Sequence, residues 1–288
     1  MVIDAKSSAL PPPEAEIVPP PDARPGVRAT AARRLRGPRA AWVAPIALGV
    51  GVLLFWEFLA RVVRLNPLIL PTPESVVGAF WASARDGTLL AASATTLEES
   101  LAGFALGACV ALPVGYAVAR SRWFAWALQP YIAASQALPG VAVAPLLVVW
   151  LGYGLLPIAV LGALIVFFPA AIATTLGLRS LDHEVLDAAR VDGADRWTLL
   201  RFIEWPLALP AILAGLRTSV TLCIIGAVVG EFVLGSSGFG LGSLLTIALS
   251  QLDTPLIFAL LLALALLAAV LYGGARLVER RVSYLEEC

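Results

Sequence analysis

Charged residues are scarce in this chain of 288 residues, at 14% of the total, whereas hydrophobic residues make up 59%. This balance excludes an ordinary soluble protein and indicates an integral membrane protein. The formal net charge is zero, so the overall charge does not favour binding to nucleic acid. The placement of charges along the chain is therefore more informative than their sum.

Residues that carry catalysis or bind metals are also few. Histidine occurs once, at His183, and the three cysteines at positions 109, 223 and 288 are too scattered for a disulfide framework or a metal site. The chain contains no GxxxxGK(S/T) phosphate loop, so it has no loop of that kind with which to hydrolyse ATP. We predict no catalytic residue, no metal site and no cofactor in this chain.

The apolar segments predict an all-α membrane protein with six transmembrane helices. A helix needs about 20 apolar residues to cross roughly 30 Å of hydrocarbon. Two such segments lie in the charge-free stretch 123–178, which the Gly-Tyr-Gly sequence at 152–154 divides. The others lie at 41–60, within a first helix of 41–64, and at 93–119, 206–230 and 254–275.

Arginines beside these spans predict the orientation, because positive charge collects on the cytoplasmic side. With six spans, most of them fall on one side, which places both termini in the cytoplasm: Arg33, Arg34, Arg36, Arg39, Arg120, Arg122, Arg179, Arg190, Arg196, Arg201, Arg276, Arg280 and Arg281. Arg61, Arg64 and Arg85 lie on the opposite side and do not outnumber them. Residues 1–40, rich in proline and arginine, are predicted to be a disordered cytoplasmic tail, and residues 284–288 a short C-terminal tail.

A polar stretch, EVLDAARVDGADRW at 184–197, interrupts the apolar second half of the chain. It predicts two short helices joined by Gly193, a residue that can take the left-handed conformation ending the first helix. A solvated loop is the alternative. The apolar side chains exceed what such a loop needs and favour a docking surface for a soluble partner: Leu186, Ala188, Ala189, Trp197, Leu199 and Leu200.

The run DAARVDGADRWTLLRFIEWP, 187–206, resembles the EAA loop of permease subunits of bacterial binding-protein-dependent ABC importers. The matching positions are Ala188, Ala189, Gly193, Ile203 and Pro206. Asp187 stands in place of the family's glutamate, and Trp205 in place of a leucine. The resemblance extends over about 65–283 and includes LPTPESV at 70–76 and GEFVLGSSGFGLGSLL at 230–245. These stretches are similar to the branch of the family that serves nitrate, taurine, aliphatic sulfonates and some vitamin precursors.

This resemblance implies a type I ABC importer permease fold (MetI-like) over 65–283, in the bacterial cytoplasmic membrane. It implies that the loop at 184–206 docks on a separate ATPase chain, which binds ATP and magnesium. The implied assembly has two ATPase subunits, a second permease copy and a periplasmic or lipid-anchored substrate-binding protein. The expected function is import of a small, anionic solute by alternating access.

Three residues within spans are candidates for the substrate pathway: Gln136, Arg217 and Thr221. A charge in a span costs about 2.5 to 3.5 kcal/mol, so Arg217 is expected to face protein or water. Gln136 lies beside Pro139 and Gly140, and interrupted helices are tolerated where they line a cavity. For each residue, a structural role in helix pairing or in a kink is the alternative.

Paired glycines in GFALG at 103–107 and GAVVG at 226–230 predict close helix packing, within the chain or against a second copy. The cluster GSSGFGLG at 235–242 predicts a turn and re-entrant segment at the outer mouth. An ion-coupled secondary transporter is the alternative function, but spans three and four lack the ionisable residues that it requires. A membrane-embedded enzyme would need a nucleophile, metal site or acid/base pair that the sequence does not offer.

Overall fold

The computed structural model describes residues 38–63, 66–135, 140–235 and 238–286. The chain divides into two units, residues 1–52 and 53–288. In the first unit, the described residues form the beginning of helix α1 (Pro38–Arg61), and their large apolar side chains are exposed.

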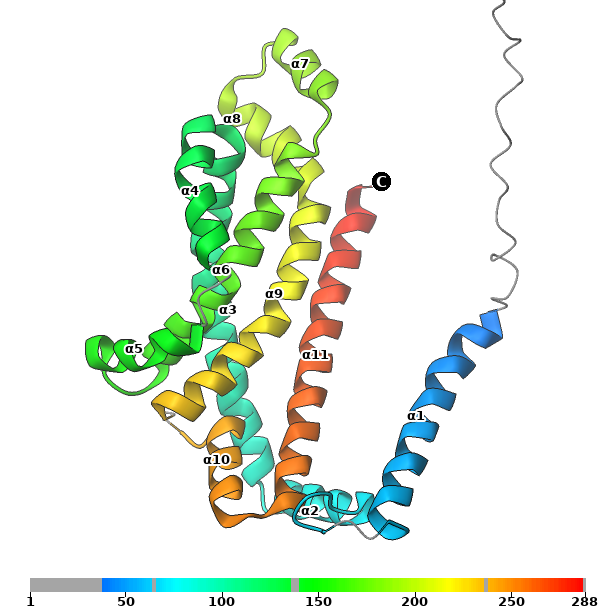
Figure 1. The fold of residues 1–288 in the computed structure, drawn as a ribbon. Coiled ribbons are helices and arrows are strands. Elements are labelled where there is room, and N and C mark those ends of the chain that lie inside the picture. Colours follow the sequence, from blue (N-terminus) through cyan, green and yellow to red (C-terminus); the bar gives the residue numbers. More distant parts are fainter. Residues whose placement is uncertain (1–37, 64–65, 136–139, 236–237, 287–288) are drawn as a thin grey trace, which may run out of the picture. The chain divides into compact units, whose positions relative to one another are not determined.

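The second unit is built of helices. Its elements, after the end of α1, are α2 (Pro73–Arg85), α3 (Thr88–Arg120), α4 (Arg122–Ser135), a 3₁₀ turn (Gly140–Val143), α5 (Ala144–Leu151), α6 (Leu155–Arg179), α7 (His183–Val191), α8 (Arg196–Leu199), a π-helical turn (Leu200–Glu204), α9 (Trp205–Leu234), α10 (Leu241–Gln251) and α11 (Thr254–Glu286). Figure 1 shows α3, α6 and α9 side by side, with α11 along α9. The helices α7 and α8 stand at one end of this bundle, and α2 and α10 at the other.

Glycines let α3 and α9 approach α6 closely. A Cβ atom added at Gly226 would lie 2.8 Å from the Cα of Gly162, and one added at Gly107 would lie 2.9 Å from the carbonyl oxygen of Ala163. Real Cβ contacts are not this short, so these positions accept no larger residue without moving a backbone. The paired glycines therefore serve helix packing, as the sequence predicts, and the partner is α6 of the same chain.

Four helices in the described ranges are long and apolar enough to cross a membrane: α3, α6, the continuous stretch Arg196–Leu234, and α11. They correspond to the predicted second, fourth, fifth and sixth spans. The predicted first span is helical as α1, and the third is divided into α4, the 3₁₀ turn and α5. Pro130 lies within α4 and Pro145 at the start of α5, where a proline removes a backbone donor. The six-span topology remains a prediction.

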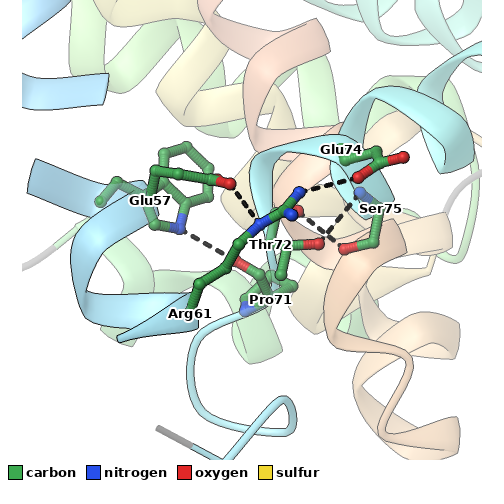
Figure 2. Close-up of polar contacts among 7 residues, drawn as sticks. Glu57, Arg61, Pro71, Thr72, Glu74 and Ser75 are labelled. Atoms are coloured by element: carbon green, nitrogen blue, oxygen red, sulfur yellow. Dashed lines mark hydrogen bonds and ion pairs between the residues drawn. The ribbon is translucent and has the colours of Figure 1, made fainter. Parts of the chain in front are cut away.

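The segment that leads into α2 is held by side chains from α1 and α11. Trp56 Nε1 donates to the carbonyl oxygen of Pro71 over 2.9 Å, and Thr254 Oγ1 donates to that of Leu68 over 2.9 Å. Thr72 caps α2 by accepting from Ser75 N, as Figure 2 shows. The LPTPESV motif is thus a helix start, with proline at the first helical position.

An arginine at the end of α1 links this helix to α2. Arg61 contacts the carboxylates of Glu57 and Glu74, the second over 2.9 Å (Figure 2). All three side chains are substantially exposed, so this ion pair contributes little to stability.

A buried glutamate holds the start of α10. The Glu231 side chain accepts from Ser243 N at Oε2 over 3.0 Å and from Thr96 Oγ1 at Oε1 over 2.6 Å. The same threonine hydroxyl accepts from Leu241 N over 2.8 Å. Two backbone donors in the first turn of α10 are therefore satisfied by side chains of α9 and α3. Gly242 lets this turn approach α9, because a Cβ there would lie 2.8 Å from the carbonyl oxygen of Val228.

Candidate functional site

The helix α7 presents most of its surface to solvent. Asp182 begins it by accepting from Glu184 N over 2.9 Å, a typical N-cap. Leu186 is the buried residue of this helix, at 2% exposure, whereas Val191 near its end is 87% exposed. One buried apolar side chain thus anchors the helix, and most of its other residues are exposed to solvent.

Gly193 makes the turn after α7. Its φ is +90°, in the left-handed region that disfavours other residues. Gly193 N donates to the carbonyl oxygen of Arg190 over 3.1 Å, and Ala194 N donates to that of Ala189 over 3.0 Å. This pair of bonds is the Schellman arrangement that satisfies the last carbonyls of a helix. The positive φ predicted for Gly193 is confirmed.

The chain returns to the bundle through α8. Asp195 caps this short helix by accepting from Thr198 N over 3.0 Å. Hydrogen bonding from Thr198, by its side chain first and then its backbone, lowers the pKa of the Asp195 carboxyl. The cap therefore stays ionised, and accepting, to a lower pH than an ordinary aspartate would.

A π-helical turn joins α8 to α9. Trp205 N donates to the carbonyl oxygen of Leu200, five residues back, and Pro206 follows with no N–H to donate. The sequence predicts a second helix after Gly193, and the structure makes it continuous with the fifth span. This joins the polar segment directly to α9.

The segment 184–206 has two limbs, an outgoing limb formed by α7 and a returning limb from Ala194 to Pro206. The residues matched to the EAA loop are distributed over both limbs. Asp187 and Ala188 are exposed on α7, and Ala189 is half-buried. Ile203 and Pro206, both half-buried, lie where the segment rejoins the bundle. Asp187 Oδ1 accepts from Arg190 Nη1 over 2.7 Å, a contact between two exposed side chains.

Sequence reasoning missed the contacts that tie the returning limb, and the end of α6 that leads into α7, to the end of α3. Arg120 pairs with the buried carboxylate of Glu204, with Nε donating to Oε2 over 3.1 Å. Arg179, at the end of α6, donates from Nη2 to the carbonyl oxygen of Val118 over 3.0 Å. The available signal was Glu204 itself, an acidic residue within an apolar run, which needs a partner when buried.

Arg217 is paired within the bundle. Its Nη1 donates to Glu279 Oε2 on α11 over 2.7 Å, and its guanidinium lies 5.2 Å from the ring centroid of Tyr272. Thr221, one turn further along α9, donates from its hydroxyl to the carbonyl oxygen of Thr218 over 2.7 Å. The third pathway candidate, Gln136, lies outside the described residues.

Known proteins resemble this chain in sequence and fold. The riboflavin transport system permease protein RibX of Chloroflexus aurantiacus is 43% identical over 239 residues, covering 81% of this chain and 88% of that protein. The putative aliphatic sulfonates transport permease protein SsuC of Escherichia coli (strain K12) is 32% identical over 238 residues, covering 83% and 90%. The taurine transport system permease protein TauC of the same strain is 29% identical over 263 residues, covering 87% and 95%.

A solved structure of the MetNI methionine ABC transporter in an inward-facing conformation contains a chain with the same fold. The TM-score is 0.60 at 18% identity, covering 67% of this chain and 95% of that one. The family model for the binding-protein-dependent transport system inner membrane component matches residues 107–284. The chain therefore belongs to the family of binding-protein-dependent transport system inner membrane components, and is a multi-pass ABC transporter permease of the inner membrane.

Proposed function

We propose that this permease carries a small solute into the cytoplasm by alternating access, driven by ATP hydrolysis on a separate chain. Two copies would pair with each other, bind two ATPase subunits and receive solute from a substrate-binding protein. Each copy would cross the membrane six times, with both termini in the cytoplasm. ATP and magnesium would bind to the ATPase, and this chain would hold no cofactor.

The observation that carries this proposal is the segment 184–206. Its helix α7 is anchored by Leu186 and otherwise open to solvent. The turn at Gly193 sets the angle between the two limbs, and the return limb continues into α9. A helix exposed in this way can sit in a groove of a soluble partner, and its covalent link to α9 passes any displacement to the bundle.

Alternating access requires that the same helices take two arrangements, and each end of this segment is attached to a different helix of the core. Movement of α7 would be passed to α6 at the start of the segment and to α9 at its end. Arg217 and its partner Glu279 connect α9 to α11, so this pair is placed to hold one arrangement. Gln136, Arg217 and Thr221 are our candidates for the pathway, with Arg217 acting through its ion pair.

Two classes of solute are candidates. The sequence resemblance favours a small anion of the sulfonate or taurine kind, and the relatives SsuC and TauC carry those names. RibX, at the higher identity of 43%, is named for riboflavin. Uptake of labelled taurine and labelled riboflavin by cells carrying the complete system, with and without this chain, would separate the two.

Site-specific crosslinking tests the coupling role. Cys109, which is exposed, and the terminal Cys288 are first replaced by serine, so that neither supplies a competing thiol. Ala188→Cys then places a thiol on the exposed surface of α7, and Val77→Cys places one on α2, at the other end of the bundle. We expect the first variant, but not the control, to crosslink to the ATPase in membranes.

Crosslinking from both positions, or from neither, would contradict the coupling role. The alternative, an ion-coupled secondary transporter, predicts that uptake by this chain needs no ATPase and follows an ion gradient. Uptake in vesicles that lack the ATPase would favour that alternative.

A further inference from the structure

Two adjoining cavities lie between the end of α3 and the returning limb of the segment 184–206. The first, of about 400 Å³, is lined mainly by apolar and aromatic side chains: Leu112, Pro113, Tyr116, Trp197, Leu200 and Trp205. The second, of about 830 Å³, is lined mainly by charged ones: Arg120, Arg190, Asp195, Arg196 and Glu204. Tyr116 lines both, so the two cavities are neighbours along α3.

Polarity changes in one direction along this part of α3. Leu112, Tyr116 and Arg120 follow one another at intervals of four residues, so they lie on one face of the helix. At 1.5 Å per residue, this face passes from aliphatic through aromatic to cationic within roughly 12 Å. Tyrosine and tryptophan are enriched where hydrocarbon meets water. The apolar cavity thus lies on the membrane side of that boundary, and the charged cavity on the water side.

The two cavities carry an excess of positive charge. Four arginines line them, with Arg201 at the apolar one, against two carboxylates. Both carboxylates are already engaged, Glu204 with Arg120 and Asp195 with the backbone of Thr198. Arg190 is paired as well, with the exposed carboxylate of Asp187. Among the described residues, Arg196 has no carboxylate within ion-pair distance. Its guanidinium is available for an anion.

We propose that the two cavities together hold one anionic phospholipid from the leaflet on the α7–α8 side. Its phosphate would be bound by Arg196, and by Arg190 in addition to its solvent-exposed pair with Asp187, and one acyl chain would lie against Pro113 and Trp205. Basic pockets between membrane helices bind anionic headgroups in this way. A free phosphate would use only the charged cavity, whereas an apolar cavity beside a charged one fits an amphiphile. The lipid would lie against the limb that rejoins α9.

Lipid retention by the purified full chain tests this. The chain is extracted from bilayers of equal phosphatidylglycerol and phosphatidylcholine with matched acyl chains, and bound lipid is measured by native mass spectrometry. We expect phosphatidylglycerol to be retained in preference. Arg196→Gln should lower its retention about fivefold, since one arginine near an anionic surface contributes about 1 kcal/mol. Leu112→Trp should abolish retention by filling the apolar cavity.

Matched controls make the result specific. Arg122→Gln removes an exposed arginine of α4, and Leu106→Trp enlarges an exposed leucine of α3, and neither residue lines the cavities. Both should retain lipid as the unmodified chain does. Elution as a single folded species is required of every variant, and the two cavity variants test separate halves of the site.

Equal retention of the two lipids, or cavity variants that match their controls, would overturn the proposal. If Arg196→Gln is deficient while Leu112→Trp is normal, an anion binds without an acyl chain, and the proposal also fails. Retention is measured without ATPase, binding protein or solute. A negative result therefore leaves the transport function standing, and failure of transport leaves this result standing.

Discussion

Substitution of Gly193 tests the link between backbone geometry and coupling most directly. The residue has a φ of +90°, and a Cβ atom built on it would meet nothing within 4 Å. Steric crowding therefore plays no part, and the cost of a replacement is the backbone conformation alone. That cost is about 1 to 2 kcal/mol for an L-residue, highest when the side chain is β-branched.

The size of this conformational cost predicts the order of severity of three variants. Asparagine is the residue after glycine that most often takes this conformation, so Gly193→Asn should be nearly normal. Gly193→Ala should shift the turn toward other conformations by about fivefold, and Gly193→Val by about 30-fold, following the conversion of 1.4 kcal/mol to a factor of ten. Since only the competent conformation binds, apparent affinity for the ATPase should fall by at most the same factors.

The assay measures membrane abundance, co-purification of the ATPase and solute uptake for all three variants. Abundance should be unchanged, because Gly193 is exposed and outside the helical core. ATPase recovery and uptake should fall in the order Asn, Ala, Val. Gly78→Val is the matched control, since a Cβ there also meets nothing within 4 Å and no left-handed φ is involved.

Full uptake by Gly193→Val would refute this reasoning, because the glycine would then be only a flexible loop residue. Loss of the protein from the membrane would also refute it, since the substitution would then act on folding. Equal loss in the asparagine and valine variants would show that the backbone conformation is not the cause.

Three further predictions concern other parts of the chain. Arg217→Gln and Glu279→Gln should each lower the thermal stability of the purified chain. The stability loss of the double variant should be smaller than the sum of the two single losses by about 0.5 to 3 kcal/mol. Strictly additive losses would mean that the ion pair contributes nothing. Glu231→Ala should lower the free energy of unfolding by about 1 to 3 kcal/mol, because it removes the acceptor of Thr96 and of a backbone donor of α10, and Glu231→Gln should lower it less. Equal thermal unfolding of the two variants would contradict this. Removal of residues 1–39 should leave uptake normal, since their composition cannot bury a core, and loss of uptake at normal membrane abundance would count against it.

Hydropathy located the helices well because burial in lipid requires a continuous apolar run. The stretches predicted at 93–119 and 206–230 lie within α3 and α9, which extend a few residues beyond them. Paired glycines predicted close packing, but their spacing cannot name the partner helix. That partner is α6, where Gly162 lies next to Gly226.

The polar segment shows what local signals can and cannot supply. Gly193 was predictable as a turn because glycine takes a left-handed φ at lower cost than any other residue. The π-helical turn before Pro206 was not predicted, because the shift in hydrogen bonding depends on how α8 continues into α9. The pairs Arg120 with Glu204 and Arg217 with Glu279 join residues 84 and 62 positions apart, which no spacing rule connects.

The contacts at the end of α3 bear on how the proposed coupling segment would transmit force. A loop attached only at its ends would absorb a push on α7 by bending. Here Arg179, the last residue of α6 before the segment begins, donates to the carbonyl oxygen of Val118, and Glu204 ties the returning limb to Arg120, two residues along the same helix. The helix end before the segment and the returning limb within it are therefore held to one turn of α3 by bonds with a charged partner, which are stronger than neutral ones. Displacement of α7 would then act on α3 together with α6 and α9, the three helices that pack closely against one another through glycines such as Gly107 and Gly226.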